Sequence, residues 1–302
     1  MRIFVAGASG AIGEPLIAEL IRQGHTVTGM TSSEAKAKKL LTQGAAAEIV
    51  NVFDAAAVES ALCRSKFEIV INQLTALPKN PADLPKYLLG DRKLRLEGGR
   101  NLQRAAEVSG VRRYIQQASG FFLKPGKGLA DESVGLAINA SPGVAASAQM
   151  YAELEKRTLA SRTIEGIVLR YGFFYGPNTW YHPDGGTADQ VRQQQFPIVG
   201  QGQGVWSFVH IEDAAQATVA ALTVEPGVYN IVDDDPSSVS QWLPRYARWL
   251  GAPPPPNVSE QAARETAGED AVYYATKLRG STNLKAKKAL NFRARRLLWL
   301  KD

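Results

Sequence analysis

A glycine-rich turn near the amino terminus constrains the fold more than any other feature of the sequence. The run Arg2-Ile3-Phe4-Val5-Ala6 has the apolar, β-branched character of a buried strand, and it leads into Gly7-Ala8-Ser9-Gly10-Ala11-Ile12-Gly13 and an amphipathic helix. Such a turn cradles phosphates, because the glycines permit close backbone approach and the helix N-terminus offers free N–H groups. The sequence therefore predicts a dinucleotide site with contacts from Gly7, Ser9, Gly10, Ala11, Ile12 and Gly13.

Short apolar runs alternate with longer helical patterns, which is typical of βαβ units. Strands are expected at 2–6, 26–30, 47–52, 68–72, 113–118 and 165–170, and helices near 11–23, 33–43, 54–64, 84–109 and 144–161. A strand and a helix at 205–223, a strand at 228–232 and a helix at 238–250 follow. We predict an α/β protein with a doubly wound parallel Rossmann sheet and a smaller C-terminal α/β substrate lobe.

The expected domain boundaries lie where this alternation loosens into loops rich in glycine, proline and aromatic residues. Residues 1–172 plus 204–232 are predicted to form the NAD(P)-binding Rossmann domain, and residues 173–203 plus 233–302 the substrate-binding lobe. Four consecutive prolines at 253–256 form a stiff connector inside the lobe. Their fixed φ angles and missing N–H donors cannot continue a helix.

Composition narrows the class of protein. The single cysteine, Cys63, excludes an intramolecular disulfide, and no apolar run reaches the roughly 18 residues of a membrane span. We expect a cytoplasmic protein with no membrane partner. The net charge of +6 comes largely from C-terminal lysines and arginines without aromatic residues spaced for base stacking, so we expect no nucleic-acid partner. The three histidines are scattered, and no metal site is predicted.

Several further segments occur at regular intervals after the glycine turn. They are Asn51-Val52-Phe53-Asp54, Arg113-Tyr114-Ile115-Gln116-Gln117-Ala118-Ser119, Leu169-Arg170-Tyr171-Gly172-Phe173-Phe174-Tyr175-Gly176-Pro177, Phe208-Val209-His210-Ile211-Glu212-Asp213 and Tyr229-Asn230-Ile231-Val232-Asp233-Asp234. With the G-x-x-G-x-x-G spacing, they resemble the extended and atypical short-chain dehydrogenases/reductases, including nucleotide-sugar epimerases and dehydratases. The resemblance implies that Asp54 contacts the adenine, and that Leu74, Thr75, Tyr171 and Phe174 line the dinucleotide groove. Asp54 could equally cap the helix at 54–64.

The residues after the second strand favour NADP over NAD. Family members selective for NAD carry an acid there, but this chain has Thr31, followed by Ser32 and Ser33. These hydroxyls and Lys36 can bind a 2′-phosphate that no carboxylate repels. The alternative interpretation is that the three hydroxyl residues simply cap the next helix.

The catalytic residues depart from the pattern that the resemblance implies, a Ser or Thr after the fifth strand and a Tyr-x-x-x-Lys pair on the next helix. Ser119 fits the first role, as a donor to a substrate oxygen. Tyr151 is followed four residues later by Glu155, and Lys156 lies about 140° around the helix. In this first register, Tyr151 takes the tyrosine position and Glu155 the lysine position. A second register places Ser147 at the tyrosine position and Tyr151 at the lysine position. In the first register, the neighbouring carboxylate should raise the pKa of Tyr151.

The predicted substrate is a small molecule, apolar or aromatic. Sugar-nucleotide members carry an arginine seven residues before the Asp of the His-x-x-Asp segment, and here that position is Trp206. Other aromatic residues fall on segments that surround the nicotinamide in the family: Phe121, Phe122, Phe173, Trp180 and Tyr181. We therefore predict an aromatic pocket, although the same rings could form the core between the lobes. Arg192 or Arg279 could also replace the lost arginine.

Three classes of function therefore stay open. The first is an NAD(P)-dependent oxidoreductase acting on a carbonyl or alcohol group. The second is a nucleotide-sugar epimerase or dehydratase. The third is a protein that holds the dinucleotide without redox turnover, as a sensor or as a non-redox cyclase or isomerase. A homodimer is one option for its assembly.

Overall fold

A seven-stranded parallel sheet forms the centre of the protein, in a computed structural model that describes residues 1–300. The strand order is β11-β6-β5-β4-β1-β2-β3. The strands are β1 (Arg2–Ala6), β2 (Thr26–Thr31), β3 (Ala46–Ile49), β4 (Ile69–Asn72), β5 (Arg113–Ser119), β6 (Glu165–Tyr171) and β11 (Gly227–Ile231). The order reverses between β1 and β4, which confirms the predicted doubly wound sheet.

Helices cover both faces of this sheet, because side chains along each strand alternate between the two faces. Ile3 and Val5 pack with α1 (Gly13–Arg22) and α8 (Ile211–Ala220), whereas Phe4 packs toward α3 (Ala55–Cys63) and α5 (Gly99–Val108). Further helices are α2 (Glu34–Thr42), α4 (Leu84–Lys93) and α6 (Pro142–Leu159), and a 3₁₀ turn spans Pro81–Asp83. None of the helices within residues 1–300 is long and apolar enough to cross a membrane.

The helix expected at 84–109 contains an irregularity that the sequence did not announce. A π-helical turn, Leu94–Gly98, joins α4 to α5. Such turns insert one extra residue per turn and occur often at functional sites. Here the π turn faces α6, against which it packs.

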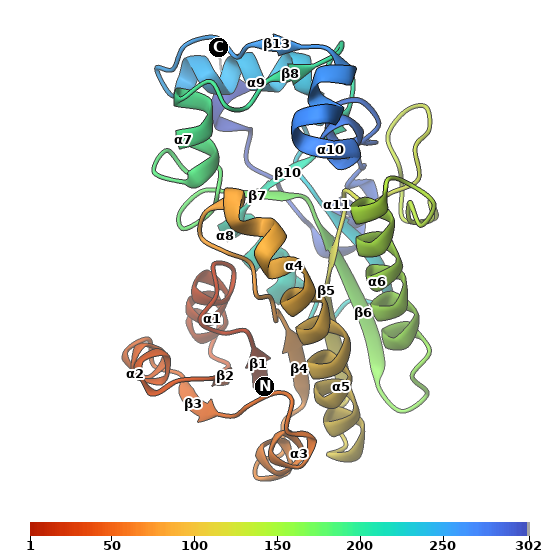
Figure 1. Cartoon of the computed structure of the whole chain (residues 1–302). Helices are drawn as coiled ribbons and strands as arrows, with labels where there is room; N and C mark the ends of the chain where they lie inside the picture. The colour runs from red at the N-terminus through yellow and green to blue at the C-terminus, as the bar shows by residue number, and fades with distance from the viewer. Residues whose placement is uncertain (301–302) are drawn as a thin grey trace.

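The C-terminal lobe lies at the carboxyl end of the sheet (Figure 1). Its short strands pair as β7 (Phe173–Tyr175) with β10 (Phe208–His210), β9 (Val205–Trp206) with β12 (Ser237–Ser238), and β8 (Ile198–Val199) with β13 (Asn257–Val258). Its helices are α7 (Gly186–Arg192), α9 (Val239–Trp249) and α10 (Glu260–Thr276), and a 3₁₀ turn spans Leu298–Leu300. The proline connector leads into β13, and the carbonyl of Pro256 accepts a 2.8 Å hydrogen bond from the N–H of Ile198.

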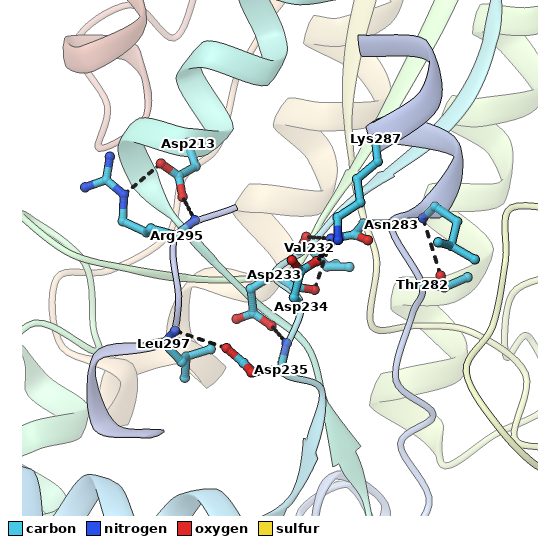
Figure 2. A network of polar contacts seen from close by, with 11 residues as sticks. Asp213, Val232, Asp233, Asp234, Asp235, Thr282, Asn283, Lys287, Arg295 and Leu297 are labelled. Carbon is cyan, nitrogen blue, oxygen red and sulfur yellow. Dashed lines mark hydrogen bonds and ion pairs between the residues drawn. The ribbon is translucent and has the colours of Figure 1, made fainter. Parts of the chain in front are cut away.

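The C-terminal segment ties the lobe back to the Rossmann half (Figure 2). Asp213, at the start of α8, accepts bonds of 2.8 and 2.7 Å from the backbone N–H and Nε of Arg295. Asn283 Nδ2 donates to the carbonyl of Val232 at 2.8 Å. Within the range 233–302 that the sequence assigns to the lobe, α11 (Leu284–Leu290) packs on β11 and α8, next to the Rossmann sheet. The domain boundaries stay a prediction.

Candidate functional site

The glycine turn stands at the carboxyl end of β1 in a geometry that only glycine allows. Gly7 has φ +79°, and a Cβ there would overlap the backbone carbonyl of Gln73. A Cβ at Gly13 would overlap the carbonyl oxygens of Gly7 and Ala8, so the first turn of α1 lies directly on the strand end. Gly10 N–H closes the turn onto Gly7 O at 3.0 Å, and its Cα side is exposed. The turn thus leaves room for a phosphate next to the backbone.

The neighbouring strand ends complete a rim around this turn. Two polar atoms there are buried without a partner within residues 1–300, Oγ1 of Thr31 at the end of β2 and Oε1 of Gln73 directly after β4. Buried polar atoms normally have hydrogen-bond partners, so the rim fits a ligand that supplies them. Gln73 was not among the predicted residues, although its place directly after a buried strand is the signal that could have found it.

The other predicted cofactor residues have varied surroundings. Asp54 caps α3, accepting a 3.0 Å bond from Ala57 N–H, so its capping role is observed and its adenine contact stays a prediction. The Tyr171 hydroxyl is occupied inside the protein, by Gln73 Nε2 at 3.1 Å and Thr218 Oγ1 at 2.7 Å, and burial raises its pKa to about 12. Its ring packs at 5.3 Å from that of half-buried Phe174. Contacts of Tyr171 and Phe174 with the cofactor stay a prediction, and they would involve ring edges and faces because the Tyr171 phenol is already hydrogen-bonded.

Seven further cofactor candidates are exposed or half-buried. Ser33 occupies the N-cap of α2 without a capping bond from its side chain, and Ser32 and Lys36 are exposed. Thr75 is exposed after half-buried Leu74, whose N–H is held at 3.0 Å by Asn72 Oδ1. Ser9 is half-buried within the glycine turn and Ala11 is exposed.

The three predicted catalytic residues lie on β5 and α6, which pack together. Ser119 is the last residue of β5 and is buried, with Oγ 3.5 Å from the N–H of Phe121. Tyr151 is buried on α6, its ring stacked on Phe122 with the centroids 5.6 Å apart. Ser147 lies one turn earlier and is half-buried.

The residue at the lysine position of the first register, Glu155, has a structural partner. Its carboxylate accepts two bonds of 2.7 Å from Nε and Nη2 of Arg170 on β6, and both side chains are buried. Lys156 is exposed on the other side of the helix. Burial, not the carboxylate as expected from sequence, is the largest cause that raises the pKa of Tyr151; Arg95 lowers it, and Asp91 and Glu155 raise it less.

A buried arginine that the sequence analysis missed stands beside Tyr151. Arg95, in the π turn, lies with its guanidinium carbon 5.3 Å from the centroid of the Tyr151 ring. Its Nε donates to Asp91 Oδ2 at 2.7 Å. Nothing in the local sequence distinguishes this arginine from its exposed neighbours Lys93 and Glu97. It is buried as part of the π turn, which the sequence does not announce.

The six predicted substrate residues gather in one aromatic cluster between sheet and lobe. Phe173 stacks on Phe121 at 4.0 Å and on Trp206 at 4.2 Å between centroids. Phe122, Tyr181 and Trp206 are buried, as a core role requires, whereas Phe121, Phe173 and Trp180 are half-buried. The cluster thus supports both interpretations, with an inner core and a partly accessible outer layer.

The arginines considered as replacements for the lost cation are engaged elsewhere. Arg192 donates to the carbonyl of Pro183 at 2.8 Å, and Arg279 to the carbonyls of Gly128 and Lys127 at 2.9 Å. Within the described residues, no group of three or more His, Cys, Asp or Glu side chains could hold a metal ion.

The chain is similar in sequence to a known protein family and to characterised enzymes. Residues 3–232 match the model of the NAD dependent epimerase/dehydratase family. The chain belongs to this family. It is 39% identical over 302 residues to a 3-diazoavenalumate denitrifying reductase from a Streptomyces species, covering 99% of this chain and 98% of that protein. It is 22% identical over 258 residues, 80% of this chain and 77% of the relative, to a UDP-N-acetyl-alpha-D-glucosaminuronate decarboxylase from Bacillus cytotoxicus.

Solved structures share the fold over nearly the whole chain. The UDP-glucose 4-epimerase of Thermus thermophilus in complex with NAD superposes with a TM-score of 0.72 at 21% identity, over 99% of this chain and 96% of that one. The dTDP-glucose 4,6-dehydratase DesIV of Streptomyces venezuelae gives a TM-score of 0.75 at 16% identity, over 99% and 93%. With the family and the reductase relative, these findings identify the chain as an enzyme of the NAD(P)-dependent oxidoreductase type.

Proposed function

We propose that this enzyme is an NADPH-dependent reductase that replaces the diazo group of a small aromatic acid or phenol by hydrogen. The observation that carries the proposal is the 39% identity, along the full length of both chains, to the Streptomyces denitrifying reductase. When bound, NADPH supplies the hydride of the balanced reaction Ar–N₂⁺ + NADPH → Ar–H + N₂ + NADP⁺, in which a C–H bond forms and the C–N electron pair leaves with nitrogen.

The absent Tyr-x-x-x-Lys pair supports this chemistry over carbonyl reduction. Reducing a carbonyl creates an alkoxide that must receive a proton from a positioned acid. The balanced diazo reaction consumes no proton. Here the first-register lysine position holds Glu155, committed to Arg170, and Lys156 is exposed. The chain's residues then have to bind and orient the ring, exclude water and stabilise charge.

The aromatic cluster supplies surfaces for an aromatic ring. Phe121 and Phe173 are half-buried and continue the stack that ends on Trp206, whose Nε1 donates to the carbonyl of Tyr274 at 2.8 Å. Offset stacking on such rings contributes about 0.5–1.5 kcal/mol beyond area burial. Ser119, at the end of β5, is proposed to donate a hydrogen bond to a substrate oxygen, with Tyr151 and Ser147 alongside.

NADP is the proposed cofactor, since β2 ends in Thr31 and not in an acid. Within residues 1–300 the Thr31 hydroxyl has no hydrogen-bond partner, and the side chain of Ser33 makes no capping bond. With exposed Ser32 and Lys36, these groups can donate to a 2′-phosphate. Parallel titrations should give tighter binding of NADPH than of NADH, and Lys36→Ala should weaken NADPH alone. Lys38→Ala, exposed on the same helix, is the matched control. Tighter NADH binding would contradict the assignment.

A nucleotide-sugar epimerase or dehydratase is the second candidate function. It is favoured by the decarboxylase relative and by structural neighbours whose structures contain NAD with nucleotide ligands. Trp206, in place of a fixed cation, and the engaged Arg192 and Arg279 weigh against a diphosphate.

One substrate panel separates these functions. The enzyme with NADPH is incubated with 4-carboxybenzenediazonium, with aromatic and aliphatic aldehydes, and with UDP- and dTDP-glucose, and NADPH oxidation, nitrogen release and sugar products are followed. We expect nitrogen release and NADPH oxidation in equal amounts with the diazonium salt alone. Turnover of a nucleotide sugar, or of aldehydes without diazo reduction, would overturn the proposal.

A further inference from the structure

Arg95 carries a buried positive charge that the protein itself leaves incompletely satisfied. Its side chain is 3% exposed, and its Nη1 is buried with no hydrogen-bond partner within residues 1–300. A buried donor on a charged group is costly to leave unpaired. This charged donor is therefore available to an acceptor that lies outside the chain.

The guanidinium is held in one orientation. Asp91 Oδ2 accepts from Arg95 Nε at 2.7 Å, and Asp91 Oδ1 accepts from the backbone N–H of Ala76 at 2.6 Å. Ala76 belongs to the loop that follows β4, next to Leu74 and Thr75 in the predicted dinucleotide groove. Asp91 thus fixes Arg95 relative to the groove where the reacting ends of cofactor and substrate would meet.

Arg95 is also placed against the proposed aromatic site. Its guanidinium lies over the ring of Tyr151, which stacks on Phe122, and Phe122 contacts the ring of Phe121 at 4.8 Å between centroids. The π turn, Leu94–Gly98, brings the arginine to this position from a helix whose neighbouring residues Lys93 and Glu97 are exposed. Cation, tyrosine and aromatic wall form one contiguous group from three elements.

We propose that Arg95 is the anion-recognition residue of this enzyme, and that its free Nη1 N–H binds an anionic oxygen of the aromatic substrate, a carboxylate or a phenolate. The inference rests on the proposed aromatic substrate class and deepens it. A guanidinium donates well-directed, charge-assisted bonds to such oxygens. Asp91 orients the guanidinium, and Tyr151 contributes the ring face beneath it.

The two kinds of oxygen predict different kinetics. A remote carboxylate keeps its charge throughout the reaction, so Arg95 would bind substrate and transition state alike and lower KM. A phenolate conjugated with the diazo group shares its charge in the substrate, and the charge localises on oxygen as nitrogen leaves. Arg95 would then stabilise the transition state more than the substrate and raise kcat.

Binding measurements test the proposal without turnover. Calorimetry measures the affinities of benzoate and of phenols that are ionised at the assay pH, with benzamide and the methyl ethers as neutral analogues. The enzyme–NADP⁺ complexes compared are wild type, Arg95→Met, Arg95→Lys and the exposed control Arg100→Met. We expect wild type to prefer an anionic ligand by about 10- to 100-fold, the range for one charge-assisted bond. Arg95→Met should abolish the preference, Arg95→Lys should retain part of it, and Arg100→Met should leave it intact.

Equal wild-type affinities for the anionic ligands and their neutral analogues would overturn the proposal, and this comparison holds even if Arg95→Met fails to fold. A change in NADP⁺ affinity with the anion preference intact would also overturn it. If no diazo compound is reduced but anion binding depends on Arg95, the proposed reaction fails and this inference stands. If diazo reduction proceeds equally in wild type and folded Arg95→Met, the reaction stands and this inference fails.

Discussion

Replacing Glu155 by glutamine should destabilise the protein without touching its chemistry. The Glu155–Arg170 pair is buried on both sides, with side chains 10% and 5% exposed, and its two bonds are 2.7 Å long. Without the carboxylate, Arg170 keeps only contacts of 3.4 Å to the carbonyls of Glu132 and Val134 besides the glutamine oxygen. Removing one partner of a buried ion pair costs about 3–5 kcal/mol.

That cost translates into a measurable melting shift. An unfolding entropy of about 2.1 cal/mol/K per residue over 302 residues gives a loss of roughly 5–8 °C in Tm. Differential scanning calorimetry of Glu155→Gln, with exposed Glu153→Gln on the same helix as control, measures it. Glu155→Lys, which restores a Tyr-x-x-x-Lys pattern, should be worse because it buries two like charges. A Tm within about 1 °C of wild type, or a stable and more active Glu155→Lys enzyme, would refute the structural role.

Three further predictions concern the cofactor turn, the reaction and pH. Gly13→Ala should weaken NADPH binding by about tenfold or more in a fluorescence titration, because its Cβ would overlap two carbonyls of the turn; unchanged affinity would contradict this. Ser119→Ala should lower turnover roughly 10²-fold while Lys156→Ala leaves it nearly intact, and comparable losses would show that the helix register is wrong. Burial, aided by Asp235 and Asp234, raises the pKa of Asp233, so its contribution to stability is full below about pH 3.9 and is lost as pH rises through the folded pKa. Urea unfolding should therefore show Asp233→Asn gaining stability over wild type from pH 5 to pH 8, whereas a pH-independent difference would disprove the linkage.

Patterns repeated along the chain made the Rossmann half predictable. The central strands β1 and β4 are short, mostly apolar runs. The glycine turn specifies its own geometry, since Gly7 needs a positive φ and Gly13 has no room for a side chain. The sequence also predicts that the aromatic residues gather, because the resemblance places their segments around the nicotinamide. Their division into buried and half-buried rings depends on packing between distant segments.

Arg95 illustrates what sequence could not supply. Its burial depends on a π turn, which has no strong sequence signature, and on Asp91 and Tyr151 from other turns and helices. The partner of Glu155 likewise lies on β6, fifteen residues away in sequence, so the glutamate was read as a neighbour of Tyr151 and not as half of an ion pair. Contacts between distant segments decide both cases, with Tyr151 on α6 for Arg95 and Arg170 on β6 for Glu155.

The proposed reaction is direct hydride transfer from NADPH to an aromatic carbon that carries a diazo group. The most direct test is single-turnover reaction of 4-carboxybenzenediazonium with NADPH deuterated at C4 of the nicotinamide, on the face the enzyme uses, followed by mass spectrometry of the benzoate. We predict one deuterium at the ring carbon that lost nitrogen, with one N₂ released per NADPH oxidised. Benzoate carrying only solvent hydrogen at that carbon, or nitrogen release without NADPH oxidation, would contradict it.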